Sequence, residues 1–327
     1  MEYVTLGRTG LKVSVAGLGC GGFSRLGLGT GKNESDAVAL VHHAFDLGVN
    51  LFDTAAVYGT EEVLGKALKT LPRDQVVIAT KAWIPRGTGG SAADRAVASL
   101  ENSLKLLGID CIDIFQLHGV SPEGYDRAHD AIAPALMKEK DKGKIRHLGV
   151  TETGSSDGEH RMLQRAVEDG LWDVVMLAFH MMHQNARTEV FPRTIANRVG
   201  TLLMFAVRNI FSKPERLKAE LRELAAKRQL PRWLADAPNP LGFLMHEEDG
   251  GAANVTDAAY RFVRHEPGVD VVLFGTGDPE HLRTNIASIL KPPLPETDRR
   301  ILAKLFGNLV GVGLDPPTYM PGLTLHH

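Results

Sequence analysis

Four side chains with acid–base chemistry lie at the ends of apolar segments in the first half of the chain. Asp53 and Tyr58 come after one such segment, Lys81 ends a second and His118 lies at the end of a third. A phenol can donate a proton, but its unperturbed pKa of about 10 means that it needs a tuning partner near neutral pH. A cation beside the ring lowers the cost of forming the phenolate. These residue types indicate proton transfer by Tyr58, tuned by Lys81.

The segments that position these residues alternate between short apolar strands and amphipathic helices. Leu100, Leu104 and Leu107, for example, recur at helical spacing before Gly108, which is typical of a helix that packs one face on a sheet. Eight alternations predict an α/β fold of the (β/α)8 TIM barrel class, with the four side chains converging at the C-terminal ends of the strands. The predicted barrel strands cover residues 16–19, 49–52, 75–81, 111–118, 144–151, 172–179, 201–206 and 271–274.

Several ordered motifs carry a resemblance to a known family. They read "LGRTGLKVSVAGLGCGGF", "NLFDTAAVYG", "ATK", "DIFQLHG" and "GKIRHLGVT". On these motifs the sequence resembles the aldo-keto reductase superfamily from about residue 3 to residue 173, and again near residues 275–289. The resemblance implies that an N-terminal hairpin, within residues 1–15, plugs the bottom of the barrel.

The resemblance also implies a reaction, which is hydride transfer between a nicotinamide cofactor and an aldehyde or ketone, in either direction. Tyr58 would act as the general acid or base, and Lys81, ion-paired with Asp53, would place a positive charge beside the phenol. His118 would orient the carbonyl or share the proton. The implied enzyme is an NAD(P)-dependent oxidoreductase that acts on CH–OH and carbonyl groups.

Cofactor binding is expected from the same resemblance, with NADP as the expected cofactor and NAD as the alternative. The turn 275–277 opens a helix that begins at Asp278 and Pro279, and it can bind phosphate through backbone N–H groups and the helix N-terminus. Asn285 matches a position that contacts adenine in relatives. The expected cofactor-binding residues are Gly21, Thr151, Glu152, Met176, Phe205, Arg208, Gly275, Thr276, Gly277, His281 and Asn285.

The expected nicotinamide pocket departs from the family pattern. Thr151 and Glu152 stand where relatives have Ser-Asn after the fifth strand, and Met176 stands where they have Gln. Those amides normally hold the nicotinamide carboxamide, so anchoring of the ring is the weakest part of the match. Phe205 is the expected aromatic ring on the nicotinamide, or Met204 takes its place if the register shifts by one residue.

The expected phosphate end also departs from the pattern. Some relatives place Lys and Arg where this chain has Gly275 and His281, and there those cations pair with the 2′-phosphate of NADP. Their replacement weakens an NADP assignment without excluding it. Arg283 and Arg208 are the expected substitutes.

The substrate side is the least specific part of the sequence. Phe23 and Trp83 lie in loops near the expected mouth and would form an apolar wall for the substrate, although both could equally be ordinary packing. The segment 208–254 follows the seventh strand and includes the acidic stretch Glu247–Asp249. It is either a substrate-side lid or an inert insertion.

Composition excludes several classes of function. A net charge of −2 offers no electrostatic case for nucleic acid or an anionic membrane, no apolar run approaches the roughly 20 residues of a membrane span, and the N-terminus lacks a signal-peptide pattern. Cys20 and Cys111 are expected to be reduced thiols of a cytoplasmic protein. The histidine spacing, including His180 and His183, predicts no metal site.

The 327 residues are expected to form one barrel domain, residues 1–327, whose partner is a small-molecule carbonyl compound. The physiological substrate, the reaction direction and the oligomeric state stay open at this point.

Two alternative readings compete with this one. Gly17-x-Gly19-x-x-Gly22 fits a dinucleotide-binding loop, but residues 23–31 show no helical period, so the helix that should receive the phosphate does not follow directly. The other alternative is a nucleotide-binding barrel that acts as a sensor or regulatory subunit with little turnover. The departures at positions 152 and 176 motivate it, and the intact set of Asp, Tyr, Lys and His argues against it.

Overall fold

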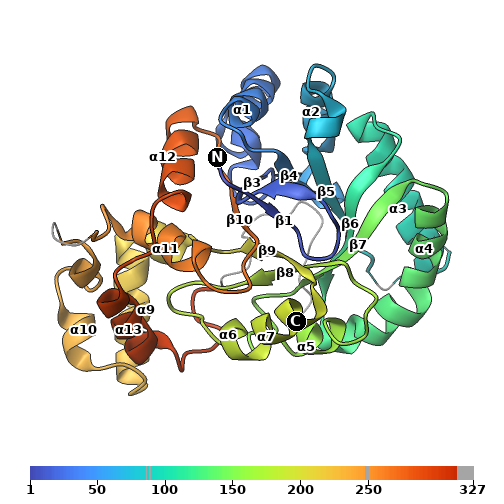
Figure 1. Cartoon of the computed structure of the whole chain (residues 1–327). Coiled ribbons are helices and arrows are strands. Elements are labelled where there is room, and N and C mark those ends of the chain that lie inside the picture. Colours follow the sequence, from blue (N-terminus) through green and yellow to red (C-terminus); the bar gives the residue numbers. More distant parts are fainter. Residues whose placement is uncertain (86, 88–89, 247–249, 315–327) are drawn as a thin grey trace.

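Eight parallel strands close into a barrel (Figure 1). The computed structural model describes residues 1–85, 87, 90–246 and 250–314. Around the barrel the strand order is β10-β3-β4-β5-β6-β7-β8-β9, which confirms the predicted (β/α)8 fold. The strands are β3 (Ala16–Gly19), β4 (Leu51–Asp53), β5 (Val77–Ala82), β6 (Ile112–Val120), β7 (Ile145–Glu152), β8 (Val174–Ala178), β9 (Gly200–Met204) and β10 (Val271–Phe274).

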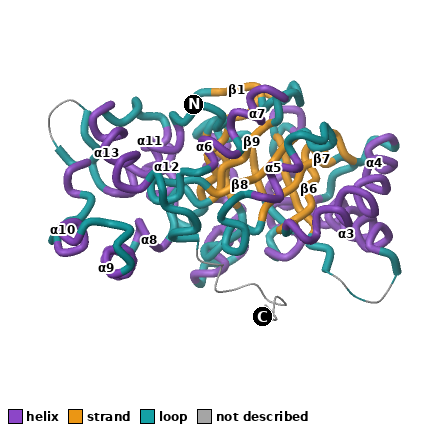
Figure 2. Tube along the Cα trace, turned by 90° about the horizontal axis from the view of Figure 1, so that it is seen from below, coloured by secondary structure: helices purple, strands orange, loops and turns teal. Residues whose placement is uncertain are grey.

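Helices surround the barrel, and local sequence explains where many of them begin and end. Ser91 and Asp94 form a capping box at the start of α3 (Ala92–Leu107), which ends at Gly108 in the left-handed conformation. Asp278 caps α12 (Pro279–Ile289) as predicted. The other helices of the barrel wall are α1 (Glu34–Asp46), α2 (Glu61–Leu68), α4 (Ala133–Asp141), α5 (Arg161–Ala166), α6 (Ala186–Glu189), α7 (Phe191–Asn197) and α11 (Val255–Arg264). The last helix, α13 (Glu296–Phe306), lies at the same side of the barrel as α9 (Pro214–Ala226) and α10 (Arg232–Asp236) (Figures 1 and 2).

The N-terminal hairpin closes the bottom of the barrel, as the sequence predicted. Strands β1 (Tyr3–Thr5) and β2 (Lys12–Ser14) pair antiparallel. Leu6 and Val13 are fully buried and join the apolar cluster inside the barrel. Gly7 has a positive φ of 50°, and a Cβ there would lie 2.2 Å from the backbone nitrogen of Gly200, so only glycine fits between the hairpin and β9.

The barrel interior is apolar in its lower part and polar at the mouth. Side chains alternate along a strand, so Leu51 and Asp53 share the inward face of β4, and Ala79 and Lys81 share that of β5. Asp53 and Lys81 therefore occupy the inward positions directly above an apolar layer. That layer includes Leu51, Val77, Ala79, Ile114, Val174, Met176, Leu202 and Val271.

The segment after β9 forms a separate group of helices at one side of the barrel (Figures 1 and 2). It contains α8 (Asn209–Ser212), α9 (Pro214–Ala226), α10 (Arg232–Asp236) and the short helical turn Gly242–Leu244. Helix α9 packs against α8 and α10, and α8 packs against α11. The acidic stretch Glu247–Asp249 lies outside the described residues, and a lid role for the segment stays a proposal.

Candidate active site at the barrel mouth

A buried ion pair lies at the centre of the site. The Lys81 Nζ atom is 2.7 Å from Asp53 Oδ2 and donates a second hydrogen bond of 2.7 Å to the carbonyl oxygen of Thr54. The Lys81 side chain has no exposed surface. Burial by itself lowers the pKa of Lys81, but attraction from Asp53 and Tyr58 outweighs burial and raises that pKa. The ammonium is therefore charged at neutral pH.

Tyr58 lies over this ammonium. It ends the helical turn Ala56–Tyr58 that follows β4, and Lys81 Nζ is 5.0 Å from the centroid of its ring. The ring packs closely on Gly21, where a Cβ would lie 2.3 Å from Tyr58 Cε2. Burial raises the pKa of Tyr58, and the charge of Lys81 opposes that rise. The phenol therefore carries its proton at neutral pH and has a cation beside it when the proton leaves.

His118 completes the group of four. Its Nε2 atom is 3.5 Å from the Tyr58 hydroxyl, and the two rings are perpendicular with centroids 5.6 Å apart. Burial lowers the pKa of His118 to about 3, and Lys81 adds to that effect. A neutral imidazole next to the phenol can donate or accept one hydrogen bond at the mouth. The four residues, which the sequence placed at the ends of three strands, thus lie together, and Tyr58 and His118 are half-buried.

The expected nicotinamide wall is assembled from several strands. Met176 lies inside the barrel, and Thr151 Oγ1 accepts a 2.7 Å hydrogen bond from the backbone N–H of Gly119. Phe205 has a positive φ of 70°, a strained conformation that occurs most often at functional sites. The Arg208 guanidinium lies 4.1 Å from the centroid of the Phe205 ring.

Glu152 differs from the role expected from its position, because its carboxylate is engaged elsewhere. One oxygen, Oε2, is 2.7 Å from His160 Nδ1, and the other, Oε1, accepts a 2.7 Å hydrogen bond from the backbone N–H of Ala178. Leu148 and Val150, which precede it at alternate positions of β7, belong to the core outside the barrel. The Glu152 side chain is therefore on the outward face of β7 and does not point to the cofactor side of the mouth.

The expected phosphate turn is exposed at Gly275 and closely packed at Gly277, where a Cβ would lie 2.3 Å from Gly27 Cα. The Thr276 hydroxyl accepts a 3.0 Å hydrogen bond from the backbone N–H of Asp278. His281 is exposed on the first turn of α12, and Asn285 is half-buried one turn later.

The two residues expected to form the substrate wall both have aromatic rings that are exposed to solvent. Phe23 is 70% exposed in the loop after β3, and Trp83 is 37% exposed directly after β5. Both follow the C-terminal ends of barrel strands, where loops converge on the mouth. Their contact with substrate stays a prediction.

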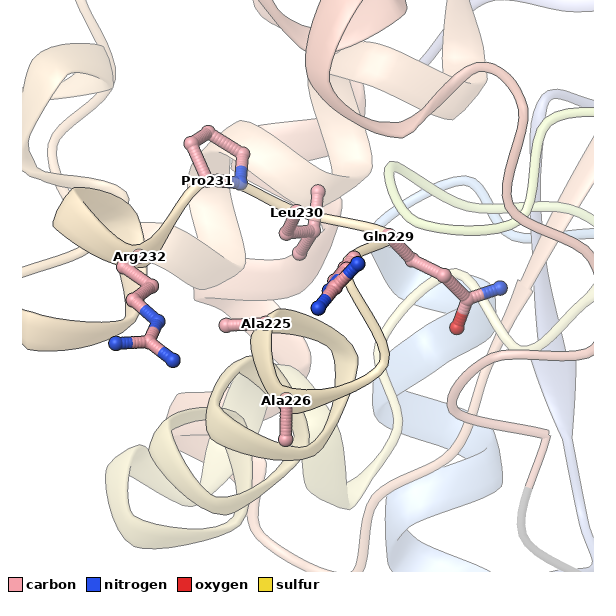
Figure 3. A pocket seen from close by; sticks show the side chains of 7 residues that line it. Ala225, Ala226, Gln229, Leu230, Pro231 and Arg232 are labelled. Carbon is pink, nitrogen blue, oxygen red and sulfur yellow. The ribbon is translucent and has the colours of Figure 1, made fainter.

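A separate pocket of about 500 Å³ lies between α9 and α10, lined by residues from Ala225 to Arg232 (Figure 3). None of the residues predicted for the site lines it. This pocket is therefore separate from the candidate active site, which stays at Tyr58.

A buried histidine cluster was missed by sequence reasoning. We use this name for Glu152, His160, His180 and His183, each at most 3% exposed. The His160 and His183 ring centroids are 5.0 Å apart, and those of His180 and His183 are 5.8 Å apart. No group of three His, Cys, Asp or Glu in the described part of the chain could hold a metal ion. The one short-range signal was the pair at positions 180 and 183, which alone does not show burial.

Comparisons with known proteins point to one family. The model of the aldo/keto reductase family matches residues 17–305. The chain is 29% identical to aldo-keto reductase YhdN of Bacillus subtilis (strain 168) over 337 residues, which cover 98% of each protein. It is 41% identical to L-galactose dehydrogenase of Arabidopsis thaliana over 157 residues. That second match covers 46% of this chain and 48% of the relative, so it spans about half of each.

Solved structures support the same fold. Aldo-keto reductase AKR11C1 from Bacillus halodurans, in its holo form, superposes with a TM-score of 0.68 at 22% identity and covers 94% of this chain and 96% of its own. The thermostable aldo-keto reductase Tm1743 superposes with a TM-score of 0.67 at 23% identity and covers 93% and 99%. At these identities the structures show the fold, while the family model also matches most of the sequence. The chain belongs to the aldo/keto reductase family.

Proposed function

We propose that this protein reduces an aldehyde or ketone to an alcohol with a reduced nicotinamide cofactor, or runs the reverse reaction. The observation that carries the proposal is the buried Asp53–Lys81 pair beneath the Tyr58 ring, with His118 within 3.5 Å of the phenol oxygen. This arrangement supplies a proton donor, a cation that stabilises its conjugate base, and a neutral imidazole at one half-buried site.

Proton transfer follows from the charges of these residues. A reduced nicotinamide, when bound, supplies hydride to the carbonyl carbon. Tyr58 donates its proton to the carbonyl oxygen as negative charge develops there, and Lys81 stabilises the tyrosinate that remains. Asp53 keeps the ammonium in place below the ring. His118, which is neutral, offers an N–H to the same oxygen and so orients the carbonyl.

The residues present fit a nicotinamide cofactor, with one difference at the carboxamide end. The Thr151 hydroxyl accepts from Gly119 and keeps its own hydrogen for donation, whereas the apolar Met176 side chain cannot replace an amide. One hydroxyl rather than two amides would hold the carboxamide. We therefore expect weaker anchoring of the ring than a Ser-Asn and Gln set provides.

The first turn of α12 decides between NADH and NADPH in this proposal. The Asp278 carboxylate accepts the backbone N–H groups of Glu280 and His281, and Glu280 pairs with Arg283 at 3.2 Å. These two N–H groups and Arg283 are thus already engaged, and the two carboxylates would repel an additional phosphate. A ribose hydroxyl can instead donate to a carboxylate. We expect NADH to bind more tightly than NADPH, which reverses the order that the sequence favoured.

The substrate class comes from the relatives. The match to L-galactose dehydrogenase makes an aldose, oxidised at a CH–OH group with NAD⁺ or NADP⁺, the first substrate to test in the reverse direction, beside the reduction of simple aldehydes. The exposed rings of Phe23 and Trp83 would form one wall of its binding site. For the cellular location of this enzyme we propose the cytoplasm. The described residues contain no helix long and apolar enough to cross a membrane.

The test measures binding first and turnover second. NADH and NADPH are titrated by fluorescence. Absorbance then follows cofactor oxidation with aldehydes and ketones, and reduction of NAD⁺ or NADP⁺ with aldoses. Tyr58→Phe removes the proton donor, and we expect kcat to fall by about 10²- to 10⁴-fold with unchanged cofactor binding. Tyr3→Phe, which changes an exposed tyrosine of the N-terminal hairpin at the opposite end of the barrel, is the matched control.

The sensor alternative predicts a different pattern in the same experiment. Its motivation is that neither Glu152 nor Met176 supplies the expected amide. Tight nucleotide binding without turnover of any carbonyl in the panel would favour it. Failure of both nucleotides to bind would overturn both functions.

A further inference from the structure

We infer that Thr151 is a positioning residue that aims His118 by holding a β-bulge in β6. The role of Thr151 in catalysis rests on the function proposed above, whereas its effect on the position of His118 does not. Three observations support the inference: a change of register beside His118, a glycine with a left-handed backbone in that bulge, and a hydrogen bond from the glycine to the Thr151 hydroxyl.

The change of register places one extra residue in β6. Leu117 pairs with Val150 of β7, and Val120 pairs with Glu152, so three steps along β6 match two steps along β7. His118 and Gly119 therefore lie opposite Thr151. Such bulges are rare between parallel strands, and near active sites they redirect a side chain.

The side chains on either side show the effect of the extra residue. Phe115 and Leu117 pack in the core outside the barrel, and Val120 packs in that same core although it lies three positions after Leu117. Strict alternation would turn Val120 to the barrel interior. The bulge restores Val120 to the outer core and leaves His118 on the inward side, toward Tyr58.

The backbone of Gly119 requires both glycine and an external partner. Its φ of +63° lies in the left-handed region, which glycine adopts without strain. Because the bulge interrupts the ladder, the Gly119 N–H needs an acceptor from outside it, and Thr151 Oγ1 supplies one at 2.7 Å. Thr151 is 1% exposed, so water does not replace this acceptor readily.

A side-chain hydroxyl is thus the chemical requirement at position 151. Serine retains the acceptor, and valine has the shape of threonine without it. Loss of the acceptor would leave the Gly119 N–H without a partner and let the bulge shift. His118 would then move relative to the Tyr58 hydroxyl, and displacement of a catalytic group by about 1 Å can cost about 100-fold in rate.

The experiment compares Thr151→Val with Thr151→Ser in the full chain, with Thr153→Val as a matched control. The Thr153 hydroxyl bonds to the exposed Ser156 and not to Gly119. Three quantities are measured: kcat and KM for the carbonyl substrate, Kd for NADH, and the imidazole ¹⁵N signals of His118, assigned with His118→Gln. If Thr151→Val does not fold, Thr151→Ala takes its place, since it also lacks the hydroxyl.

We expect Thr151→Val to lower kcat at least about tenfold and to shift the His118 signals in the protein without cofactor. Kd for NADH should rise as well, because the same hydroxyl also holds the carboxamide. Thr151→Ser restores kcat and the signals, and Thr153→Val changes neither. Unchanged His118 signals in Thr151→Val would overturn the inference. A rise in Kd alone would also overturn it, because Thr151 would then act only through the cofactor. If the wild type reduces no carbonyl, the proposed function fails, and the His118 signals still decide the positioning role.

Discussion

Two groups of titratable side chains are buried at the same end of the barrel, and they differ in their access to solvent. The catalytic group, Asp53, Tyr58, Lys81 and His118, combines a fully buried ion pair with two half-buried rings at the mouth. The histidine cluster, Glu152, His160, His180 and His183, has a carboxylate–imidazole contact, with 2.7 Å between Glu152 Oε2 and His160 Nδ1, but no ring that reaches solvent.

The histidine cluster connects segments that are distant in sequence. Glu152 accepts from the backbone of Ala178 at 2.7 Å, and His183 Nδ1 accepts a 3.1 Å hydrogen bond from the backbone N–H of Gly311. The cluster therefore joins β7, β8, α5 and the segment after α13. The comparison teaches that titratable groups with perturbed pKa values indicate chemistry only where the structure also gives them access to a ligand.

The largest effect is expected when the cation of the catalytic group, Lys81, is removed. In Lys81→Met, Asp53 stays buried without a partner, so we expect a loss of about 3–5 kcal/mol in the free energy of unfolding and a fall in kcat of about 10²-fold or more. Asp53→Asn combined with Lys81→Met should recover most of the stability but not kcat. Urea unfolding and steady-state kinetics measure the two quantities, and recovery of kcat in the double variant would contradict the assigned role.

A smaller effect is expected when the carboxylate of the histidine cluster is replaced. Glu152→Gln removes a charged hydrogen bond to His160, so we expect a loss of about 1.5–3 kcal/mol in the free energy of unfolding with kcat close to wild type. The pKa of His160, which Glu152 raises against the opposing effect of burial, should fall in an NMR titration. A loss of kcat comparable to that of Lys81→Met would show that the cluster takes part in the chemistry.

The last expected effect, which is the smallest when counted per histidine and per pH unit, is a pH dependence that originates in the histidine cluster. Burial lowers the pKa of His180 to about 3 and that of His183 to about 2. Below the unfolded value of about 6.5 the unfolded chain binds protons that the folded chain does not, so stability falls as pH decreases, by up to about 1.4 kcal/mol per pH unit for each histidine. His118 contributes in the same direction, whereas the raised pKa of His160 opposes it.

Urea unfolding between pH 7 and pH 5 measures this slope. His183→Gln removes one titrating group and should make the slope shallower, whatever its effect on stability at pH 7. His129→Gln, at a half-exposed histidine outside both groups, is the control. An unchanged slope in His183→Gln would mean that this histidine is already protonated in the folded protein.

Local sequence determined the barrel and the order of its catalytic residues. Short, continuous apolar runs placed Asp53, Lys81 and His118 at or near strand ends, and parallel strands with helical crossovers bring such ends together. The start of α12 at Asp278–Pro279 and the end of α3 at Gly108 were predictable because caps depend on a few neighbouring residues. Eight strand–helix alternations then leave few other closed arrangements.

Only the tertiary structure decided the direction of Glu152, the partner of the Thr151 hydroxyl and the existence of the histidine cluster. One extra residue in β6 changes which side chains face the barrel, and Gly119, its one local signal, does not show which strand position is displaced. The bond between His183 and Gly311 joins positions 128 residues apart. Strand periodicity depends on neighbours along the chain, whereas these contacts depend on how strands register across the barrel and on where the segment after α13 packs.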